Sequence, residues 1–351
     1  METIYKRKLA SVQTIDNIFA HGNADLLEIV IVMGWQVIVK KNEFKIGDKI
    51  IYLEIDSVCP KCEWSLFLEK VNFRIKSIKI RGQLSQGLVL PMSVLPNGKY
   101  NVGDDVTTEL SVTKHDPEQE DEIKNLANTS IRLTNFPAHL GFIKTEEPRI
   151  QSNKEYLDLF RNKKWYASLK YDGTSCTYYL NPENGKLAIC SRNNLIHMPY
   201  NEDGSINIDE IEKSKSVHLM YAVTQDVQKK LSLFPHLVLQ GEIFGSKING
   251  NKLMVSDLQF VVFSIFDMNK KLYSNLSELR HFCEKMNLNM VDIVYSGDNF
   301  DFDIPQLLDL SKGYYVNTKN HREGIVVRLQ DCSAIDGKRY SFKVINNDYL
   351  L

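Results

Sequence analysis

The sequence predicts an α+β protein of two domains, a small β-barrel followed by a domain in which helices are inserted among mostly antiparallel strands. Its 351 residues suit about two domains. Short runs of β-branched and aliphatic residues recur through the first hundred positions, whereas strand-like runs and helical periodicities mix from about residue 130. We expect the barrel to span residues 1–112, an acidic linker 113–129, and the second domain 130–351.

The first domain contains five candidate strands, at residues 29–32, 36–39, 50–55, 73–80 and 87–91. Met33, Gly34 and Trp35 separate the first two and form a hairpin signal. Five short strands in about a hundred residues are typical of a closed barrel of the OB type.

The strand predicted at residues 73–80 alternates apolar with basic side chains, which would place Arg74, Lys76 and Lys79 near one face. Two interpretations remain open. The basic face, continued by Arg81, could follow the phosphates of a nucleic acid. It could equally be the solvated outer face of a barrel strand.

The second domain mixes helical and strand-like patterns. Apolar residues at helical spacing from Met220 to Phe234 predict one helix, which Pro235 ends. Asn275 and Glu278 form a capping-box pattern before another helix. Strands are expected at residues 165–167, 176–180, 187–191, 237–242, 260–266, 324–328 and 341–345. The acidic run 115–122 reads as a linker or as the start of a solvated helix.

Composition excludes several classes of protein. A formal net charge of −1 gives no global attraction for nucleic acid, so such binding would need local basic patches. No stretch approaches the roughly 18 apolar residues of a membrane span, and no secretory signal is evident, so we expect a soluble, intracellular protein that does not act at a membrane. Six scattered cysteines suggest reduced thiols, and the lone Cys59-x-x-Cys62 lacks the second pair that a zinc site needs.

One lysine stands out as a candidate nucleophile. The run Lys-Tyr-Asp-Gly at 170–173 places Lys170 where a buried strand enters a tight turn. An ammonium with apolar walls is poorly hydrated, so we expect its pKa to be lowered and the free amine to be available for attack. Gly173 would leave room for a ligand beside the lysine. Taken alone, such a run is more often a solvated hairpin turn.

Further charged residues lie at the ends of, or within, apolar strand patterns: Arg192, Glu242, Glu323 and Lys343. Charges beside buried sequence are costly unless they are paired or bind a ligand. Each one alone could be a salt bridge, and Glu323 next to Arg322 could be an exposed charge pair. Together with Lys170, in this order along the chain, they form a strong signal for a functional site.

The motifs, taken in order, resemble those of the covalent nucleotidyltransferases. Lys-x-Asp-Gly, Ser-Arg-Asn, Gly-Glu, Phe-Ser-Ile-Phe-Asp, Glu-Gly-Ile-Val-Val-Arg and a final Phe-Lys look like motifs I, Ia, III, IIIa, IV and V of that superfamily and span residues 170–343. It includes ATP-dependent DNA and RNA ligases and mRNA capping guanylyltransferases. Here the small β-domain comes first, as in RNA ligases of the Deinococcus and Naegleria type, and residues 144–151 before the catalytic segment are similar to theirs.

This resemblance implies an ATP-dependent RNA ligase. Lys170 would attack the α-phosphorus of ATP and form a lysyl-AMP, AMP would pass to a 5′-phosphate, and a 3′-hydroxyl would displace it. The expected cofactors are ATP and Mg²⁺ or Mn²⁺. The expected partner is a nicked duplex RNA or another RNA-containing strand, as in RNA repair, and the protein is expected to be a monomer.

The resemblance also implies roles for individual residues. The metal should lie near Asp172 and Glu323, with Glu242 holding the ribose or helping with the metal. Phe266 should stack on adenine, although it lies in a run that would be a core strand in any fold. The expected phosphate and ribose contacts come from Lys343 to the α-phosphate, from Arg192 to the ribose or the 5′-phosphate, and from Arg149 to the triphosphate.

One departure from the family pattern affects motif V, in which RNA ligases often carry a second lysine. Lys343-Val344-Ile345 lacks it, and Lys338 or Arg339 could supply the charge. Two alternatives remain open. A GTP-dependent capping guanylyltransferase would need a domain after Lys343, and a non-catalytic nucleic-acid-binding protein would not need the intact lysines and glutamates.

Overall fold

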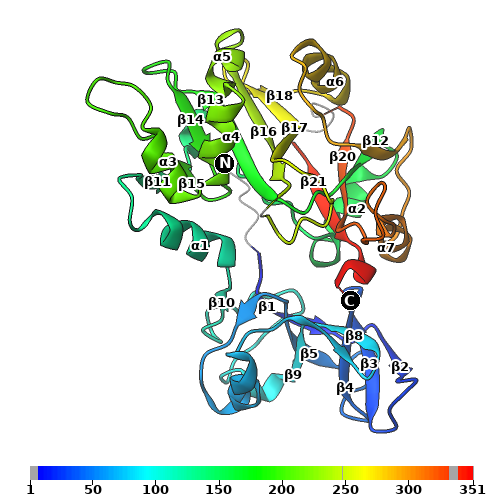
Figure 1. Cartoon of the computed structure of the whole chain (residues 1–351). Helices are drawn as coiled ribbons and strands as arrows, with labels where there is room; N and C mark the ends of the chain where they lie inside the picture. Colours follow the sequence, from blue (N-terminus) through cyan, green and yellow to red (C-terminus); the bar gives the residue numbers. More distant parts are fainter. Residues whose placement is uncertain (1–6, 247, 332–338, 351) are drawn as a thin grey trace.

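The structure, a computed structural model, describes residues 7–246, 248–331 and 339–350. Figure 1 shows a β-barrel below a larger domain that mixes a sheet core with helices, as the sequence predicts. No helix within these residues is long and apolar enough to cross a membrane.

The barrel is built from two antiparallel three-stranded sheets and two short strand pairs. One sheet has the order β1 (Ala10–Thr14), β5 (Lys49–Leu53), β9 (Leu88–Pro91). The other has the order β2 (Asn17–Ala20), β3 (Leu27–Val32), β4 (Trp35–Lys40). The short pairs join β6 (Ser57–Val58) to β10 (Thr113–Lys114) and β7 (Ser77–Ile80) to β8 (Gln83–Gln86). Two apolar clusters fill the interior, and one of them is centred on Trp35 and Tyr52.

The structure confirms the predicted hairpin but not the predicted basic strand. Met33 and Gly34 adopt φ values of 53° and 86°, and β3 pairs with β4 across this turn as expected. The strand predicted from residue 73 begins only at Ser77, so the single basic face was wrong. Arg74 turns to Asp56, with a nitrogen–oxygen distance of 2.9 Å, while Lys76 and Lys79 are exposed.

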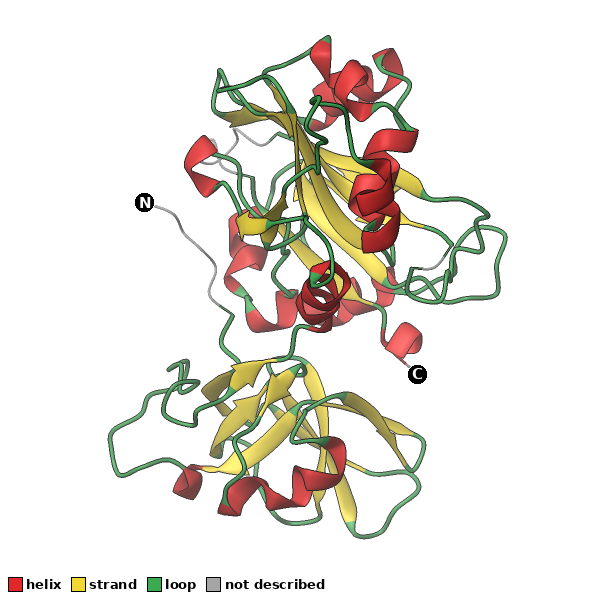
Figure 2. Cartoon of the chain, turned by 60° about the vertical axis from the view of Figure 1, so that its left-hand side comes forward, coloured by secondary structure: helices red, strands yellow, loops and turns green. Residues whose placement is uncertain are grey.

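The second domain contains two antiparallel sheets. The seven-stranded sheet has the order β11 (Leu133–Asn135), β15 (Asn194–Ile196), β14 (Leu187–Cys190), β13 (Thr174–Leu180), β16 (Leu237–Phe244), β17 (Gln259–Asp267), β18 (Leu272–Tyr273). The four-stranded sheet has the order β19 (Ile293–Gly297), β12 (Trp165–Leu169), β20 (Gly324–Leu329), β21 (Ser341–Ile345). Figure 2 shows helices packed on the outside of these strands.

Seven α-helices accompany the sheets in the part of the chain that the structure describes. They are α1 (Pro117–Leu126), α2 (Glu155–Phe160), α3 (Ile208–Ser214), α4 (Val217–Thr224), α5 (Val227–Ser232), α6 (Leu276–Lys285) and α7 (Ile304–Ser311). Short 3₁₀ turns are η1 (Glu63–Val71), η2 (Met92–Val94), η3 (Ala138–Leu140), η4 (Ile150–Ser152) and η5 (Asn347–Leu350). Helices α4, α5 and α6 pack on the larger sheet, and α7 packs on the smaller one.

Two helix predictions can be compared with the structure. The capping box at α6 is confirmed, since Asn275 and Glu278 each bond the other's backbone N–H. The single helix predicted from Met220 to Phe234 is wrong, because Asp226 takes a left-handed φ of 47° and divides it into α4 and α5. The acidic segment after β10 forms α1, whose Leu126 is buried in the core of the larger domain.

The connection between the two sheets positions the site. Strand β12 belongs to the four-stranded sheet and β13 to the seven-stranded sheet, so the turn Lys170–Gly173 passes from one to the other. Strands β16, β20 and β21 carry side chains toward this turn from both sheets. The space between the sheets is therefore where the predicted charged residues can meet.

Candidate active site

A cavity of about 210 Å³ lies at the turn between the two sheets. Six of the residues predicted from sequence line it: Lys170, Asp172, Arg192, Glu242, Glu323 and Lys343. Gly173 lines it as well. Lys170 and Lys343 lie 173 positions apart in the sequence. Such distant residues meet only because the two sheets face each other.

Lys170 makes an ion pair with Glu323, with 2.8 Å between Nζ and Oε2. Burial by itself would lower the pKa of Lys170, but the carboxylates of Glu323 and Glu242 outweigh burial and raise it above its ordinary value. The expected lowering is therefore wrong for the protein without its ligands. Lys170 is an ammonium here, and it must lose a proton before it can act as a nucleophile.

Glu242 projects from β16 beside a bulge in its pairing with β17. Burial raises the pKa of Glu242 to about 8; the Lys170 charge opposes this shift, and the Glu323 charge adds to it. Among the described residues, no side chain forms an ion pair or hydrogen bond with this carboxyl. At neutral pH this half-buried carboxyl is therefore mostly protonated, and a nearby cation would favour its ionised form.

Lys343, on β21, has its pKa shifted in the opposite direction. Burial lowers the pKa of Lys343 to about 7, and the nearby charges of Arg149 and Lys170 lower it further. Its backbone N–H donates to the Pro148 carbonyl at 2.8 Å, which fixes the strand next to the segment before η4. Within the described chain its ammonium has no ion-pair partner, so an anionic ligand would stabilise it.

Asp172 and Gly173 complete the turn after Lys170. The Asp172 carboxylate accepts one hydrogen bond from Asn249 at 3.0 Å and one from the Tyr349 hydroxyl at 2.7 Å. A Cβ on Gly173 would lie 2.3 Å from the Ile243 carbonyl oxygen, so glycine is required here by the close approach to β16. The room expected for a ligand is instead taken by this strand.

Of the two predicted arginines, Arg192 lines both the Lys170 cavity and an adjoining one, whereas Arg149 lines only the adjoining one. Arg192 lines the Lys170 cavity, but its guanidinium is paired with Asp116 at 2.6 Å and Glu118 at 3.5 Å, both at the start of α1. Arg149 instead lines an adjoining cavity of about 200 Å³ between the barrel and the larger domain. Its guanidinium lies over the Trp35 ring at 5.3 Å, and its Nη1 is buried without a hydrogen-bond partner.

Phe266 is the predicted site residue that the structure contradicts. It is 2 % exposed and packs with Phe142 and Tyr273 in a separate apolar cluster away from the cavity. Phe263 lines the cavity instead. Phe263 is the extra residue of the β17 bulge, between the pairs Gln240–Ser264 and Gly241–Val262, and it packs with Leu169 and Tyr171 beside the cavity. Alternation along the sequence does not reveal this bulge, so no signal in the sequence distinguished Phe263 from Phe266.

Of the two proposed replacements for the second motif V lysine, the structure describes only Arg339. Arg339 lies beside Glu147 at 3.7 Å and over the Tyr273 ring at 5.1 Å, and it does not line the cavity. Lys338 lies outside the described residues. Glu147 is held by Arg328 at 3.0 Å as well, so Arg339 belongs to a buried structural ion-pair cluster.

Sequence reasoning missed three residues that bind the nucleophile turn: Asn249, Tyr315 and Tyr349. The Tyr315 hydroxyl donates to the Lys170 carbonyl at 3.2 Å and accepts from the Glu323 N–H at 3.2 Å. None of the three lies in a motif, and only the fold brings them to the turn.

The acidic side chains suit a divalent cation only in part. No group of three or more His, Cys, Asp or Glu among the described residues could hold a metal by itself, so Asp172, Glu242 and Glu323 do not form a preformed cage. Mg²⁺ and Mn²⁺ at phosphoryl-transfer sites use one or two carboxylates together with phosphate oxygens and water. The uncompensated Glu242 next to Glu323 fits such a shared site.

Comparisons with known proteins agree with this geometry. A model of the RNA ligase family matches residues 163–345, just over half of the chain. The chain belongs to the RNA ligase family. It is an enzyme of that family, with the α+β fold and leading barrel predicted from its sequence, and a model of an OB-fold domain matches residues 9–92.

Solved structures are similar to this RNA ligase over its whole length. The Naegleria gruberi RNA ligase with pyrophosphate is 29% identical, with a TM-score of 0.80 and 98% of each chain covered. A variant of that ligase with ATP and manganese is 28% identical, with a TM-score of 0.77 and the same coverage. A variant with AMP and manganese is 28% identical, with a TM-score of 0.78 and 98% of each chain covered. A search of curated proteins finds no match.

Proposed function

We propose that this enzyme joins a 3′-hydroxyl to a 5′-phosphate in RNA, using ATP and a divalent cation, Mg²⁺ or Mn²⁺. The observation that carries the proposal is the Lys170 cavity, in which this lysine is paired at 2.8 Å to Glu323. Beside it lie the half-buried carboxyl of Glu242 and the half-buried ammonium of Lys343, neither of which has an ion-pair partner among the described residues. The similar Naegleria gruberi ligase structures with ATP, AMP or pyrophosphate and manganese support the same ligands here.

The reaction follows from the groups in the cavity. Lys170 gives up its proton, for which Glu323 is the nearest base, and its nitrogen attacks the α-phosphorus of ATP. The N–P bond forms as the bond to the β-phosphate oxygen breaks, and pyrophosphate leaves. A 5′-phosphate oxygen of RNA then displaces Lys170, and a 3′-hydroxyl finally displaces AMP to form the phosphodiester.

Each step is a displacement at phosphorus, so the protein contributes mainly by positioning and charge. When bound, the divalent cation supplies positive charge that neutralises phosphate oxygens and offsets the carboxylates that raise the pKa of Lys170. Lys343 would contact the α-phosphate, and Glu242 would hold the ribose or, with Asp172 and Glu323, the cation. Phe263 would stack on adenine in place of Phe266.

Both arginines would contact the phosphates from outside this centre. Arg149, whose Nη1 has no hydrogen-bond partner, would reach the triphosphate from the adjoining cavity. Arg192 would contact the ribose or the 5′-phosphate after it leaves Asp116 and Glu118.

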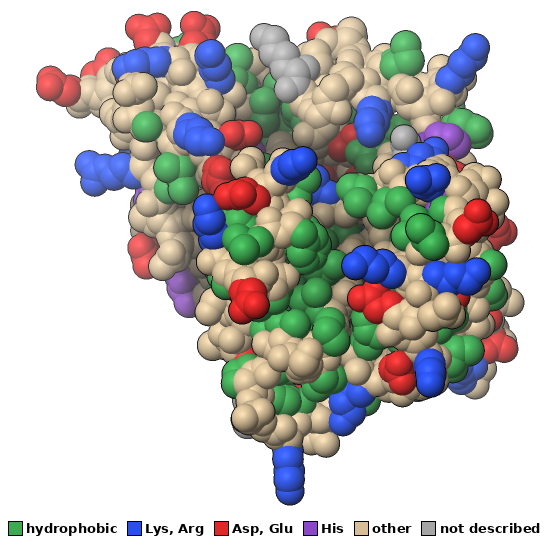
Figure 3. All heavy atoms as spheres, turned by 90° about the horizontal axis from the view of Figure 1, so that it is seen from below, with side chains coloured by type: hydrophobic (Ala, Val, Ile, Leu, Met, Phe, Trp, Pro, Cys, Tyr) green, Lys and Arg blue, Asp and Glu red, His purple; other side chains and the backbone are tan. Residues whose placement is uncertain are grey.

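We further propose that residues 1–112 help to bind the RNA, that residues 113–129 link the domains, and that residues 130–351 form the catalytic domain of a monomer acting on nicked duplex RNA. Figure 3 shows the lower, barrel side of the molecule, where both basic and acidic side chains lie around exposed apolar ones. Lys76 and Lys79 are exposed on the barrel. Binding by the full chain should weaken as salt increases, and insensitivity to salt would contradict a phosphate-binding surface.

A sealing assay tests the main proposal. Wild-type protein with ATP and Mn²⁺ or Mg²⁺ should seal a nicked RNA duplex, whereas Lys170→Ala should not. A wild-type protein that seals nothing on a panel of nicked RNA and DNA duplexes would contradict it. Parallel reactions with α-labelled GTP test the guanylyltransferase alternative, which predicts label on the chain from GTP but not from ATP. Tight RNA binding without label from either nucleotide would favour a non-catalytic protein.

A further inference from the structure

The turn that carries Lys170 is held by hydrogen bonds at every one of its residues. The Lys170 N–H donates to the Gly324 carbonyl at 3.0 Å, and its carbonyl accepts from Tyr315 at 3.2 Å. The Tyr171 hydroxyl donates to Asp292 at 3.0 Å. These contacts fix the first half of the turn to the four-stranded sheet and its loops.

The second half of the turn is held by two side chains from elsewhere in the chain. Asn249 Nδ2, in the β16–β17 loop, donates to both Asp172 Oδ1 and the Gly173 carbonyl at 3.0 Å. The Tyr349 hydroxyl, in the C-terminal turn η5, donates to Asp172 Oδ2 at 2.7 Å. Each carboxylate oxygen of Asp172 therefore has one donor, and the two donors come from different segments.

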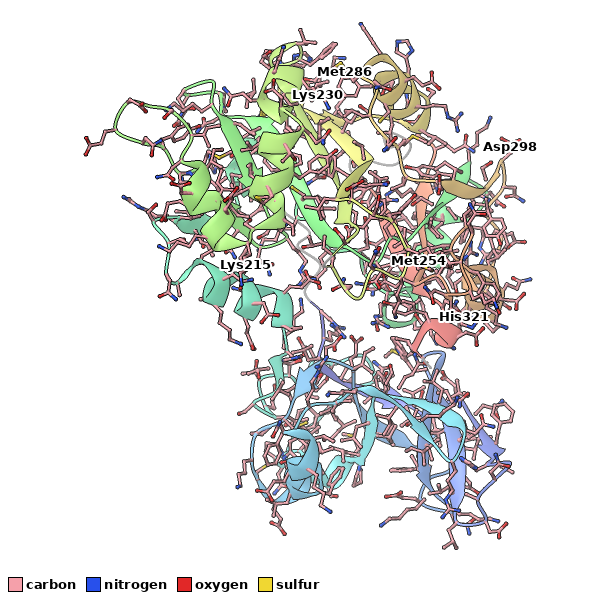
Figure 4. The ribbon with its side chains drawn as sticks, in the orientation of Figure 1. Lys215, Lys230, Met254, Met286, Asp298 and His321 are labelled. Carbon is pink, nitrogen blue, oxygen red and sulfur yellow. The ribbon has the colours of Figure 1, made fainter. Side chains whose placement is uncertain are left out.

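Tyr349 is itself packed in place. Lys252 of the β16–β17 loop lies over its ring, with Nζ 3.6 Å from the ring centroid. Asn320 donates to the Lys252 carbonyl at 2.8 Å and ties this loop to the segment that leads into Glu323. Figure 4 labels Met254 on the loop and His321 on the segment, and both lie on the side of the larger domain that faces the barrel.

We propose that Tyr349 and Asn249 are positioning residues for the nucleophile, which clamp Asp172 and thereby aim Lys170 at the α-phosphorus of a nucleoside triphosphate. The inference rests on the proposed function and deepens it. It makes the last turn of the described chain part of the adenylylation site, although that turn follows the last nucleotidyltransferase motif and lines no part of the cavity.

How well Lys170 reacts depends on where its nitrogen lies and on how firmly the turn holds it. An in-line displacement tolerates little error in the approach of the nitrogen, and a misplacement of about 1 Å can cost 100-fold in rate. Asp172 is two residues from Lys170, so movement of its carboxylate moves the turn. The Tyr349 hydroxyl, 2.7 Å from Asp172 Oδ2, and Asn249 Nδ2, 3.0 Å from Oδ1, restrain that carboxylate from two sides.

The test compares Tyr349→Phe with a matched control, Tyr178→Phe. Tyr349→Phe removes only the hydroxyl and keeps the ring under Lys252. Tyr178→Phe also removes one hydroxyl, which donates to the His218 carbonyl at 3.0 Å in the core of the same domain. For each full-length variant, the measurements are the single-turnover rate of label transfer from α-labelled ATP to the chain, the KM for ATP and the melting temperature.

We expect the rate at saturating ATP to fall about tenfold for Tyr349→Phe, the effect of one hydrogen bond to a charged group, with KM for ATP changed by less than about twofold. Asn249→Ala should also lower this rate. The control should lower the melting temperature at least as much as Tyr349→Phe while leaving the rate near that of the wild type.

Two results would overturn the inference. One is a Tyr349→Phe rate equal to that of the wild type, and the other is an equal loss of rate in the Tyr178→Phe control. Either leaves the proposed function intact, because the wild type is labelled in the same experiment. An unlabelled wild type would instead overturn the proposed function, and with it the role of the clamp.

Discussion

Two adjoining cavities in this protein differ in how their charges are balanced. In the cavity between the barrel and the larger domain, three basic side chains are paired with acidic ones: Arg7 with Glu54 at 2.6 Å, Arg74 with Asp56 at 2.9 Å, and Lys114 with Glu146 at 2.9 Å. Arg149 also lines this cavity, but its Nη1 has no hydrogen-bond partner among the described residues. In the Lys170 cavity, Glu242 and Lys343 have no such partners among the described residues. Burial therefore shifts their pKa values to about 8 and about 7, in opposite directions.

The difference indicates where the ligand binds. Buried charges are costly unless they are paired, so a fold that keeps two unpaired ones needs something else to stabilise them. A nucleotide with its cation brings both a negative charge for Lys343 and a positive charge for Glu242. In the cavity beside the barrel, the paired charges gain less from a charged ligand, whereas Arg149 would gain a phosphate partner.

The largest expected effect comes from comparing Lys343, which lines both cavities, with Lys114, which lines only the cavity beside the barrel. Lys343→Met should lower the rate of chain labelling from α-labelled ATP by about 100-fold or more, because it removes a charge from the α-phosphate site. Lys114→Met, in the paired cavity, should change that rate by less than about threefold. Equal losses in the two variants would remove the distinction between the cavities.

Stability measured against pH sharpens the comparison. The pKa of Glu242 rises from an ordinary 4.5 to about 8 in the folded protein. The neutral Glu242 carboxyl therefore stabilises the fold fully below about pH 4.5, and this stabilisation is lost as the pH rises through about 8. Glu242→Gln stays neutral, so its melting temperature relative to the wild type should increase between pH 5 and pH 8, by a few degrees. A difference that stays constant or decreases over this range would show that Glu242 is compensated after all.

The matched control is Glu147→Gln, at a buried carboxylate that does have partners. Burial alone would raise the pKa of Glu147, but Arg339 and Arg328 outweigh burial and lower it. This variant leaves buried arginine charges uncompensated. It should therefore lower the free energy of unfolding at pH 7 by about 3–5 kcal/mol, and with it the melting temperature. A stabilised Glu147→Gln protein would contradict the assignment of paired and unpaired carboxyls.

A smaller effect concerns the adenine site. Phe263→Leu should raise the KM for ATP several-fold, because an aromatic ring against the base contributes about 1 kcal/mol beyond its buried area. Phe266→Leu should instead lower the melting temperature and leave the KM for ATP unchanged. The reverse pattern would restore Phe266 to the role first expected of it.

The smallest effect is expected from Arg74→Gln. Its ion pair with Asp56 is partly exposed, with 28% and 32% of the two side chains accessible, and such pairs contribute about 0–1 kcal/mol. The melting temperature should change by no more than a few degrees, and sealing of nicked RNA by less than about threefold. A loss of sealing comparable to that of Lys343→Met would mean that the barrel cavity holds an essential ligand.

The sequence predicted the barrel, the two-domain order and the charged residues of the cavity, because motif order and strand alternation are local properties. It could not predict the pKa of Lys170, which depends on how Glu323 and Glu242 approach it from other strands. It also placed the adenine contact on Phe266, because the bulge that turns Phe263 inward exists only when β16 and β17 pair. Tyr349 carried no signal, since only the closed fold brings η5 to Asp172.

The most direct test of the central claim is the location of AMP on the chain. Wild-type protein is incubated with ATP and Mn²⁺, digested, and its peptides are examined by mass spectrometry. The account predicts one AMP bonded to the side-chain nitrogen of Lys170, and none in Lys170→Ala. AMP on Lys343 instead, or a wild-type chain that carries no AMP, would contradict it.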